Sequence, residues 1–183
     1  MIRLFDFIFS IIGLVLTIPI FILIYVVLLV VSRKPLFFQK RVGINKKSFI
    51  IVKFRTMSEE TTSMATHLVS KSALFPFGSF LRKTKLDELP QLWNVLIGDM
   101  SLVGPRPNLF NQEELILARD SLNVYSVKPG ITGLSQINGI DMSAPELLAK
   151  TDAKMISNMS LRVYFKYIFL TVFGKGKGDN VRP

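Results

Sequence analysis

Residues 7–31 read FIFSIIGLVLTIPIFILIYVVLLVV, an uncharged apolar run with Pro19 at its midpoint. As a helix this run would extend about 38 Å, and the hydrocarbon core of a bilayer is about 30 Å thick. A proline inside a helix removes a hydrogen bond and kinks the chain. Ser10 and Thr17 precede the proline and could bond carbonyls that a bend releases. The run therefore predicts a membrane protein whose apolar helix is broken into two halves, each about 18 Å long.

Three topologies are open for this segment. Arg3 lies before the run, and four basic residues follow it: Arg33, Lys34, Lys40 and Arg41. Because basic flanks are retained in the cytoplasm, two basic flanks favour a re-entrant helix that enters and leaves on one side. A plain spanning helix is the alternative. A cleaved signal peptide is disfavoured, because the run is long and no small-residue cleavage pattern follows it.

The composition points to an anionic partner. The chain has 183 residues, enough for one domain beside the membrane segment, and its 23 Lys and Arg outnumber its 13 Asp and Glu for a net charge of +10. Lipid headgroups, nucleotides and phosphates suit this charge. The chain has no cysteine, which excludes disulfides and thiolate chemistry. Its single histidine, His67, lies in a polar stretch, which argues against a Ser-His-Asp triad and a His-rich metal site.

The rest of the chain reads as an α/β domain associated with the membrane. Two β-rich runs, 36–42 and 48–55, flank residues 43–47 and predict a small hairpin. Polar residues 57–73 predict a surface loop or short helix, and GDMSLVGPRPN and KPGITGLSQINGI predict turns and loops. Helices are expected over 85–97, 111–124, 144–158 and 161–173, the last of them interfacial or in the core. We expect a membrane segment over 1–33, a globular domain over 34–173 and a flexible tail over 174–183.

The stretch ALFPFGSFLRKTKL interleaves aromatic and basic side chains: Phe75, Phe77, Phe80, Arg82, Lys83 and Lys85. An amphipathic element in the bilayer interface and ordinary core packing explain it equally well. In the helix expected next, Pro90 must lie in the first turn, with Asp87 or Thr84 as the cap, and Gly98 ends the helix.

The adjacent carboxylates Asp87 and Glu88 are the main candidate for chemistry, with Arg82 and Arg106 on either side in the sequence. A carboxylate beside a phosphate can attack phosphorus or hold a divalent cation. An acidic pair at a helix start is more often only a cap that compensates the helix dipole.

Four segments together resemble the monotopic phosphoglycosyl transferases, the bacterial sugar transferases that begin the assembly of surface glycans. They are the proline-broken apolar run, KFRTM (53–57), LRKTKLDELPQLWNVLIGDMSLVGPRP (81–107) and KPGITGLSQING (128–139). The resemblance covers nearly the whole chain. It implies a re-entrant helix over 1–33 and a cytoplasmic catalytic domain over 34–173, which amphipathic helices hold on the cytoplasmic face of the inner membrane.

The resemblance also implies the reaction. A sugar 1-phosphate passes from a UDP-sugar to undecaprenyl phosphate, UMP is released, and the product enters exopolysaccharide or lipopolysaccharide synthesis. Asp87 would be the nucleophile and form an acyl-phosphate, and Glu88 would help bind Mg²⁺. Arg82 and Arg106 would hold the carboxylates and the phosphate, with Lys53 and Arg55 facing the same cluster.

The chain departs from the family pattern after NG, where Ile140 and Asp141 stand in place of a frequent arginine. This departure leaves the sugar open, with an N-acetylated hexose as the first expectation. The sequence also leaves open the glycan pathway and the oligomeric state, a homo-oligomer included. The main rival is a non-catalytic basic protein that binds the membrane surface. A phosphohydrolase is a second rival. A nucleic-acid role is disfavoured, because no reading helix or RNA-binding signature is present.

Overall fold

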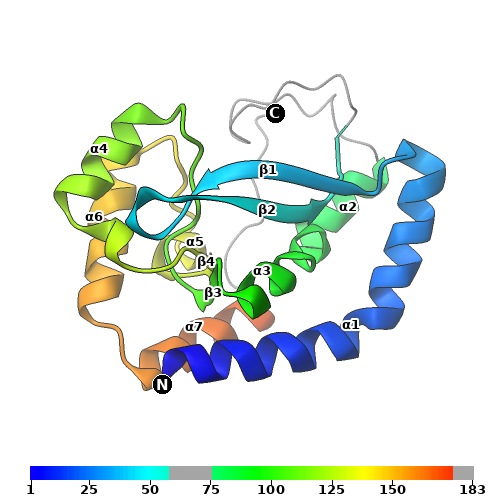
Figure 1. Ribbon diagram of the computed structural model, residues 1–183, viewed down its shortest axis with the longest axis horizontal. Coiled ribbons are helices and arrows are strands. Elements are labelled where there is room, and N and C mark those ends of the chain that lie inside the picture. Colours follow the sequence, from blue (N-terminus) through cyan, green and yellow to red (C-terminus); the bar gives the residue numbers. More distant parts are fainter. Residues whose placement is uncertain (58–75, 175–183) are drawn as a thin grey trace.

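The computed structural model describes residues 1–57 and 76–174, a mixture of helices and short sheets (Figure 1). The first part contains α1 (Ile2–Ser32), β1 (Leu36–Val42), the 3₁₀ turn η1 (Ile44–Lys46) and β2 (Ser48–Phe54). The second part contains α2 (Pro76–Thr84), η4 (Leu86–Glu88), α3 (Gln91–Ile97), β3 (Ser101–Val103), α4 (Glu113–Ser121), η5 (Val124–Ser126), β4 (Gly130–Thr132), α5 (Leu134–Ile137), α6 (Pro145–Ser157) and α7 (Leu161–Val172).

Helix α1 changes direction part-way along its length (Figure 1). Pro19 is the proline inside it. The Thr17 hydroxyl donates to the Gly13 carbonyl at 2.7 Å, a bond from a side chain to the preceding turn that often accompanies bending. A proline is the usual cause of a sharp helix kink, since its ring clashes with the turn before it. The helix is long and apolar enough to cross a membrane by length and composition.

The first half of α1 is held by polar contacts. Arg3 donates to the carbonyls of Val95 and Leu96 at the end of α3, the second at 2.8 Å. The Asp6 carboxylate is almost fully buried and accepts three bonds through Oδ1: from the Ser101 hydroxyl, the Leu102 amide and the Tyr164 hydroxyl. A buried carboxylate needs such donors, so these contacts fix the start of α1 to β3 and α7.

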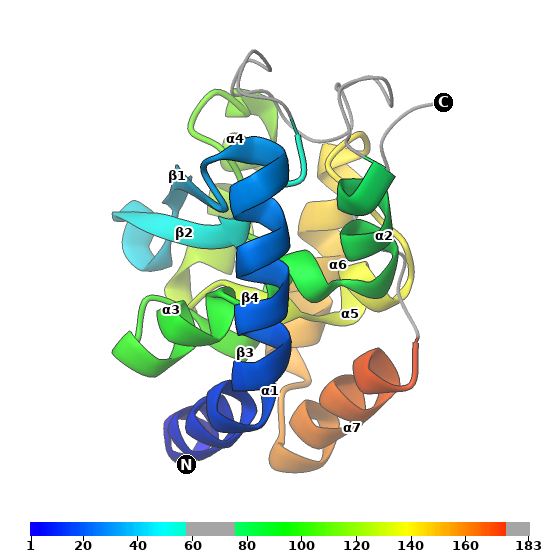
Figure 2. The same cartoon turned by 90° about the vertical axis from the view of Figure 1, so that its right-hand side faces the viewer.

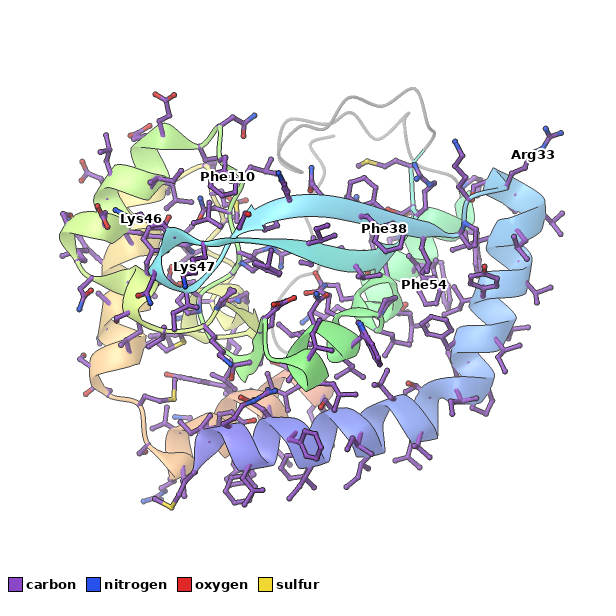
Figure 3. The ribbon with its side chains drawn as sticks, viewed as in Figure 1. Arg33, Phe38, Lys46, Lys47, Phe54 and Phe110 are labelled. Atoms are coloured by element: carbon purple, nitrogen blue, oxygen red, sulfur yellow. The ribbon has the colours of Figure 1, made fainter. Side chains whose placement is uncertain are left out.

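The second half of α1 is held by apolar packing against the same globular domain. Ile24 and Leu28 are buried in one cluster with Phe54 and Leu81. Phe54, at the end of β2, points toward this half of α1 (Figure 3), and its ring centroid lies 4.7 Å from that of Phe21. Both halves of α1 therefore contact a single body.

Strands β1 and β2 form the predicted hairpin, antiparallel from Leu36 opposite Phe54 to Val42 opposite Ser48. The amide side chain of Asn94 on α3 bonds the backbone of β2 at both Val52 N and Ile50 O. Side chains alternate along a strand, so Lys53 lies on the same face as Ile51, which packs beneath α3. The hairpin therefore presents a cation on its α3 side.

Strands β3 and β4 pair in parallel within segments that the sequence predicts as loops. Two glycines allow the backbones to meet. A Cβ atom on Gly130 would lie 2.0 Å from the Gly104 nitrogen, and one on Gly104 would lie 2.5 Å from the Lys128 carbonyl oxygen. Strands of three residues are too short to show a periodic pattern.

Helices α4, α6 and α7 confirm the helices expected over 111–124, 144–158 and 161–173. Helix α7 lies beside the first half of α1 at one side of the molecule (Figures 1 and 2), where the Phe165 ring packs 5.1 Å from that of Phe5. Its Tyr164 and Tyr167 are buried, whereas Phe169 and Phe173 are exposed. The predictions for His67, Phe75 and most of 57–73, and for the tail beyond Gly174, lie outside the described residues.

Candidate active site

The acidic pair does not cap a helix. The predicted helix over 85–97 is divided into η4, which carries Asp87 and Glu88, and α3, which begins at Gln91 after Pro90. Pro90 stands at the N-cap position of α3 with no side-chain cap, so the prediction of Asp87 or Thr84 as the cap is wrong. Lys85, with a left-handed φ of 59°, separates the acidic turn from the end of α2, whereas Leu89 and Pro90 join that turn to α3 in right-handed conformations. Gly98 ends α3 with φ 96°, as predicted.

Glu88 is the meeting point of two cations. Its Oε1 accepts from Lys53 Nζ at 2.9 Å and from Arg106 Nη2 at 3.0 Å. The side chains of Lys53 and Glu88 are each 12% exposed, so the charges lie in a partly desolvated setting where ion pairs are strong. Asp87, beside them in the same turn, is 4% exposed. The structure thus brings two of the predicted cations, Lys53 and Arg106, to the turn that carries both predicted carboxylates.

The contacts of Arg82 and Arg55 differ from those that Lys53 and Arg106 make with Glu88. Arg82 Nε donates to the Thr56 hydroxyl at 2.8 Å, while its buried Nη1 has no hydrogen-bond partner in the described part of the chain. Arg55 donates to the carbonyls of Lys34 and Leu36 and lies over the Phe37 ring at 5.7 Å. Arg55 therefore binds the backbone at the open end of the hairpin. Its contacts within residues 1–57 and 76–174 do not include Asp87 or Glu88.

Gln91 is a polar residue that the sequence reasoning missed. It begins α3, directly after the acidic turn and Pro90, and is 2% exposed. Its Nε2 is buried and lacks a hydrogen-bond partner among the described residues. Buried donors are rarely left without a partner, so this one suits a ligand atom. The available signal was its position three residues after Glu88 within the helix predicted over 85–97, since residues at that spacing share a helix face.

Lys85 also responds to this charge cluster. Desolvation lowers the pKa of its ammonium below the ordinary 10.5; Glu88 opposes the shift and Arg106 adds to it. Such environments are characteristic of functional sites, although structural ion pairs produce them too.

A buried network lies behind Arg106. The Arg119 guanidinium is 1% exposed; it donates to Asp152 Oδ2 at 2.6 Å and to the Arg106 main-chain carbonyl at 2.8 Å. Asp152 also accepts from the Ser135 hydroxyl at 2.7 Å. Burial raises the pKa of the Asp152 carboxyl, and the Arg119 charge opposes that rise. This network fixes the loop that carries Arg106 to α4, α5 and α6.

The donor set can be compared with the needs of Mg²⁺. The described residues contain no group of three or more His, Cys, Asp or Glu side chains that could enclose a metal. Mg²⁺ usually keeps several waters and binds through one or two carboxylates plus substrate phosphates. The Asp87–Glu88 turn offers that number of carboxylates, a donor set that fits magnesium.

Comparison with known proteins identifies the family. The family model described as "Bacterial sugar transferase" matches residues 1–177. The chain belongs to the bacterial sugar transferase family. The resemblance read from the sequence is confirmed at this level, and the protein is accordingly an enzyme, a transferase.

Individual relatives of this sugar transferase differ in length. The "Uncharacterized sugar transferase EpsL" of Bacillus subtilis is 42% identical over 75% of the chain and 68% of that protein. The "UDP-glucose:undecaprenyl-phosphate glucose-1-phosphate transferase" of Klebsiella pneumoniae is 38% identical over 93% of the chain but only 39% of that protein. The "Exopolysaccharide production protein ExoY" of Rhizobium meliloti is 33% identical over 93% of the chain and 83% of that protein. The chain thus spans well under half of the Klebsiella relative.

Proposed function

We propose that this sugar transferase moves a sugar 1-phosphate from a UDP-sugar to undecaprenyl phosphate and releases UMP. The observation that supports this most directly is the acidic turn itself. A nearly buried Asp87 stands next to a Glu88 that is bonded to Lys53 and Arg106. Arg82 Nη1 and Gln91 Nε2, which have no hydrogen-bond partner among the residues the structure describes, belong to the same stretch of chain. Carboxylates with surplus donors suit a substrate that carries phosphates.

The proposed chemistry takes two steps at one phosphorus. An Asp87 carboxylate oxygen attacks the phosphorus that bears the sugar, the bond from that phosphorus to the bridging oxygen breaks, and UMP leaves with that oxygen. A phosphate oxygen of the lipid acceptor then attacks the same phosphorus, and the aspartyl oxygen–phosphorus bond breaks to restore the carboxylate. A covalent intermediate lets donor and acceptor use the site in turn, so their charges need not be accommodated together.

The surrounding residues have supporting roles in this proposal. Lys53 and Arg106 hold Glu88 in place and offset the negative charge that gathers as phosphate approaches Asp87. Arg82 and Gln91 supply donors for phosphate oxygens. Glu88 is the residue that would contribute to binding Mg²⁺, which when bound neutralises diphosphate charge and makes UMP a better leaving group.

The membrane arrangement is part of the proposal. We infer that α1 is re-entrant, since Arg3 and Asp6 near its start and Ile24 and Leu28 in its second half contact the same globular domain. A straight spanning helix would place its ends about 45 Å apart on opposite sides of the bilayer. The catalytic domain would then lie on the cytoplasmic face, within reach of a lipid phosphate. The non-catalytic membrane binder is not favoured, because the family is one of transferases.

The test is release of UMP by the purified protein with undecaprenyl phosphate, Mg²⁺ and a panel of UDP-sugars: glucose, galactose and the N-acetylhexosamines. We expect UMP release that depends on the acceptor, and a fall of roughly 10³-fold or more in Asp87→Asn. Phosphate release without acceptor would instead support a phosphohydrolase. Intact-mass analysis of the quenched enzyme should detect the sugar-phosphate adduct, and full turnover by Asp87→Asn would refute the nucleophile assignment.

A further inference from the structure

A second cavity lies outside the acidic site. It has a volume of about 300 Å³ and is enclosed by the first turns of α1, strand β3, the segment before β4 and the end of α6. None of Lys53, Asp87, Glu88 and Arg106 lines it. Its volume is at the lower end of the range for ligand pockets, enough for a headgroup and part of one chain.

Two cations converge at one side of this cavity. Arg3 and Lys128 both line it. A Cβ atom built on Gly98 would lie 3.0 Å from Arg3 Nη2 and 3.3 Å from Lys128 Nζ, so both side chains end at the same glycine. The Arg3 guanidinium is held by the carbonyls of Val95 and Leu96, whereas Lys128 has no hydrogen bond or ion pair within the described ranges.

No carboxylate of the described residues forms an ion pair with either cation. Asp6 also lines the cavity, but its Oδ1 already accepts from Ser101, Leu102 and Tyr164. Two like charges at close range, in a half-buried setting, disfavour one another. An anion between Arg3 and Lys128 would remove this repulsion and give Lys128 the partner that it lacks.

The remainder of the lining is apolar and adaptable. It includes Ile2, Ile156, Met155 and Met159. Methionine side chains adjust to irregular apolar ligands. The neighbouring surface is apolar as well, because Leu4, in the first turn of α1, is 61% exposed. A ligand with an anionic head and an apolar tail matches both parts of the cavity.

We propose that this cavity binds one anionic phospholipid of the bilayer, with its phosphate at Lys128 and Arg3 and one acyl chain entering between Ile2, Ile156 and Met159. Basic pockets beside membrane helices bind anionic headgroups in this manner. The lipid would join the start of α1 to β3 and α6 and fix the depth of the domain at the membrane. This inference rests on the membrane association proposed above and does not depend on sugar-phosphate transfer.

The test counts lipids retained by the full chain in detergent, using native mass spectrometry and no UDP-sugar. Wild-type protein is expected to retain phosphatidylglycerol in preference to phosphatidylcholine. Lys128→Ala should lower the retained phosphatidylglycerol about fivefold, the worth of one lysine near a lipid phosphate. Lys150→Ala is the matched control, since Lys150 lies on α6, is 70% exposed and does not line the cavity.

A second variant tests whether the cavity binds an acyl chain of the lipid. Ile156→Trp should lower retention as well, because the larger side chain fills the cavity. Lys128→Ala needs no repacking of the core and keeps the test decisive if Ile156→Trp does not fold. Equal retention by wild type and Lys128→Ala, or no preference for the anionic lipid, would overturn the proposal. So would displacement by glycerol phosphate alone, or a stronger Lys128-dependent retention of undecaprenyl phosphate, which would assign the cavity to the acceptor. UMP release plays no part in this measurement, so the two proposals can fail separately.

Discussion

The Arg119 guanidinium donates to the main-chain carbonyl of Arg106 at 2.8 Å. A fully buried cation thus holds the backbone of a residue whose own side chain reaches Glu88 at 3.0 Å. The carbonyl bond fixes where the Arg106 side chain starts, while Asp152 balances the buried charge of Arg119. Placement of the Arg106 charge beside the acidic turn therefore depends on α4 and α6, which lie elsewhere in the chain.

Loss of Arg119 should be costly and partly rescued by a second change. Arg119→Met leaves Asp152 buried without its cation, and we expect a loss of about 3–5 kcal/mol in the free energy of unfolding. Adding Asp152→Asn should recover part of that loss, because no uncompensated charge remains. Urea unfolding of both single variants and the double variant measures the coupling. Additive losses would show that the two side chains act independently.

The two cations that bind Glu88, Lys53 and Arg106, should contribute more to turnover than an exposed lysine does. Lys53→Met and Arg106→Met each remove a bond to a charged group, which is worth about 1.5–3 kcal/mol, so kcat/KM should fall about 10–100-fold. Lys47→Met is the control, because Lys47 is exposed in the hairpin turn. If all three variants show the same kcat/KM, the Glu88 cluster has no part in the reaction.

Lys85 should titrate at a lower pH than the exposed lysines, since desolvation lowers its pKa. In the window between its folded pKa and 10.5, the unfolded chain binds the proton that the folded chain has released. The free energy of unfolding should therefore rise with pH across that window. Lys85→Met should remove this rise, as measured by denaturation between pH 8 and the upper end of the window. Carbon-13 NMR of reductively methylated lysines reports the titration directly, and a Lys85 signal that moves with that of Lys47 would contradict the prediction.

The close approach of Gly104 and Gly130 gives a contrast between crowding and backbone strain. Gly130→Ala would place a methyl group 2.0 Å from a main-chain nitrogen that cannot give way. We expect a loss of about 1–3 kcal/mol or more, since the β3–β4 pairing must open. Gly139→Ala meets no atom within 4 Å but has φ +68°, so its cost should be only the strain of about 1–2 kcal/mol. Thermal unfolding measures the stability lost in each variant, and a Gly130→Ala variant as stable as the wild type would contradict the parallel pairing.

The topology of α1 can be tested by cysteine labelling, because the chain has no native cysteine. Leu4→Cys and Arg33→Cys lie near the two ends of α1 at exposed positions. A re-entrant helix keeps both ends on the cytoplasmic side, so an impermeant thiol reagent applied outside the cell should label neither variant, and Arg33→Cys should react after permeabilisation. Labelling of Leu4→Cys from outside would mean that the helix spans the membrane.

How much of the fold and of the candidate site could be predicted from the sequence depends on how far apart in the chain the interacting residues lie. The hairpin of β1 and β2 was predictable because two β-rich runs on either side of a short loop at 43–47 are local signals. The position of Lys53 on the α3 face follows from the same alternation. The β3–β4 pairing was not predictable, because it depends on a close backbone contact between Gly104 and Gly130, residues that are distant in the sequence.

The conformation of the acidic turn could not be predicted from the sequence either. The spacing of apolar residues over 85–97 predicts one helix, and nothing local reveals that its first turn is a separate 3₁₀ turn preceded by Lys85 at φ 59°. The sequence pointed to the acidic pair, and the structure places Lys53 and Arg106 on Glu88 but Arg55 elsewhere. Arg3 was interpreted only as a flanking charge, yet it bonds the end of α3, a contact between residues 93 positions apart in the chain.

Attachment of α1 at both of its halves has a consequence for its length. Each residue turns a helix by about 100°, so deleting one residue between Asp6 and Ile24 would rotate one attachment out of register with the other. Either the Asp6 carboxylate would leave its three donors, or Ile24 and Leu28 would turn from their pocket toward lipid. The apolar segment can thus vary freely in the identity of its lipid-facing side chains while its residue count stays fixed.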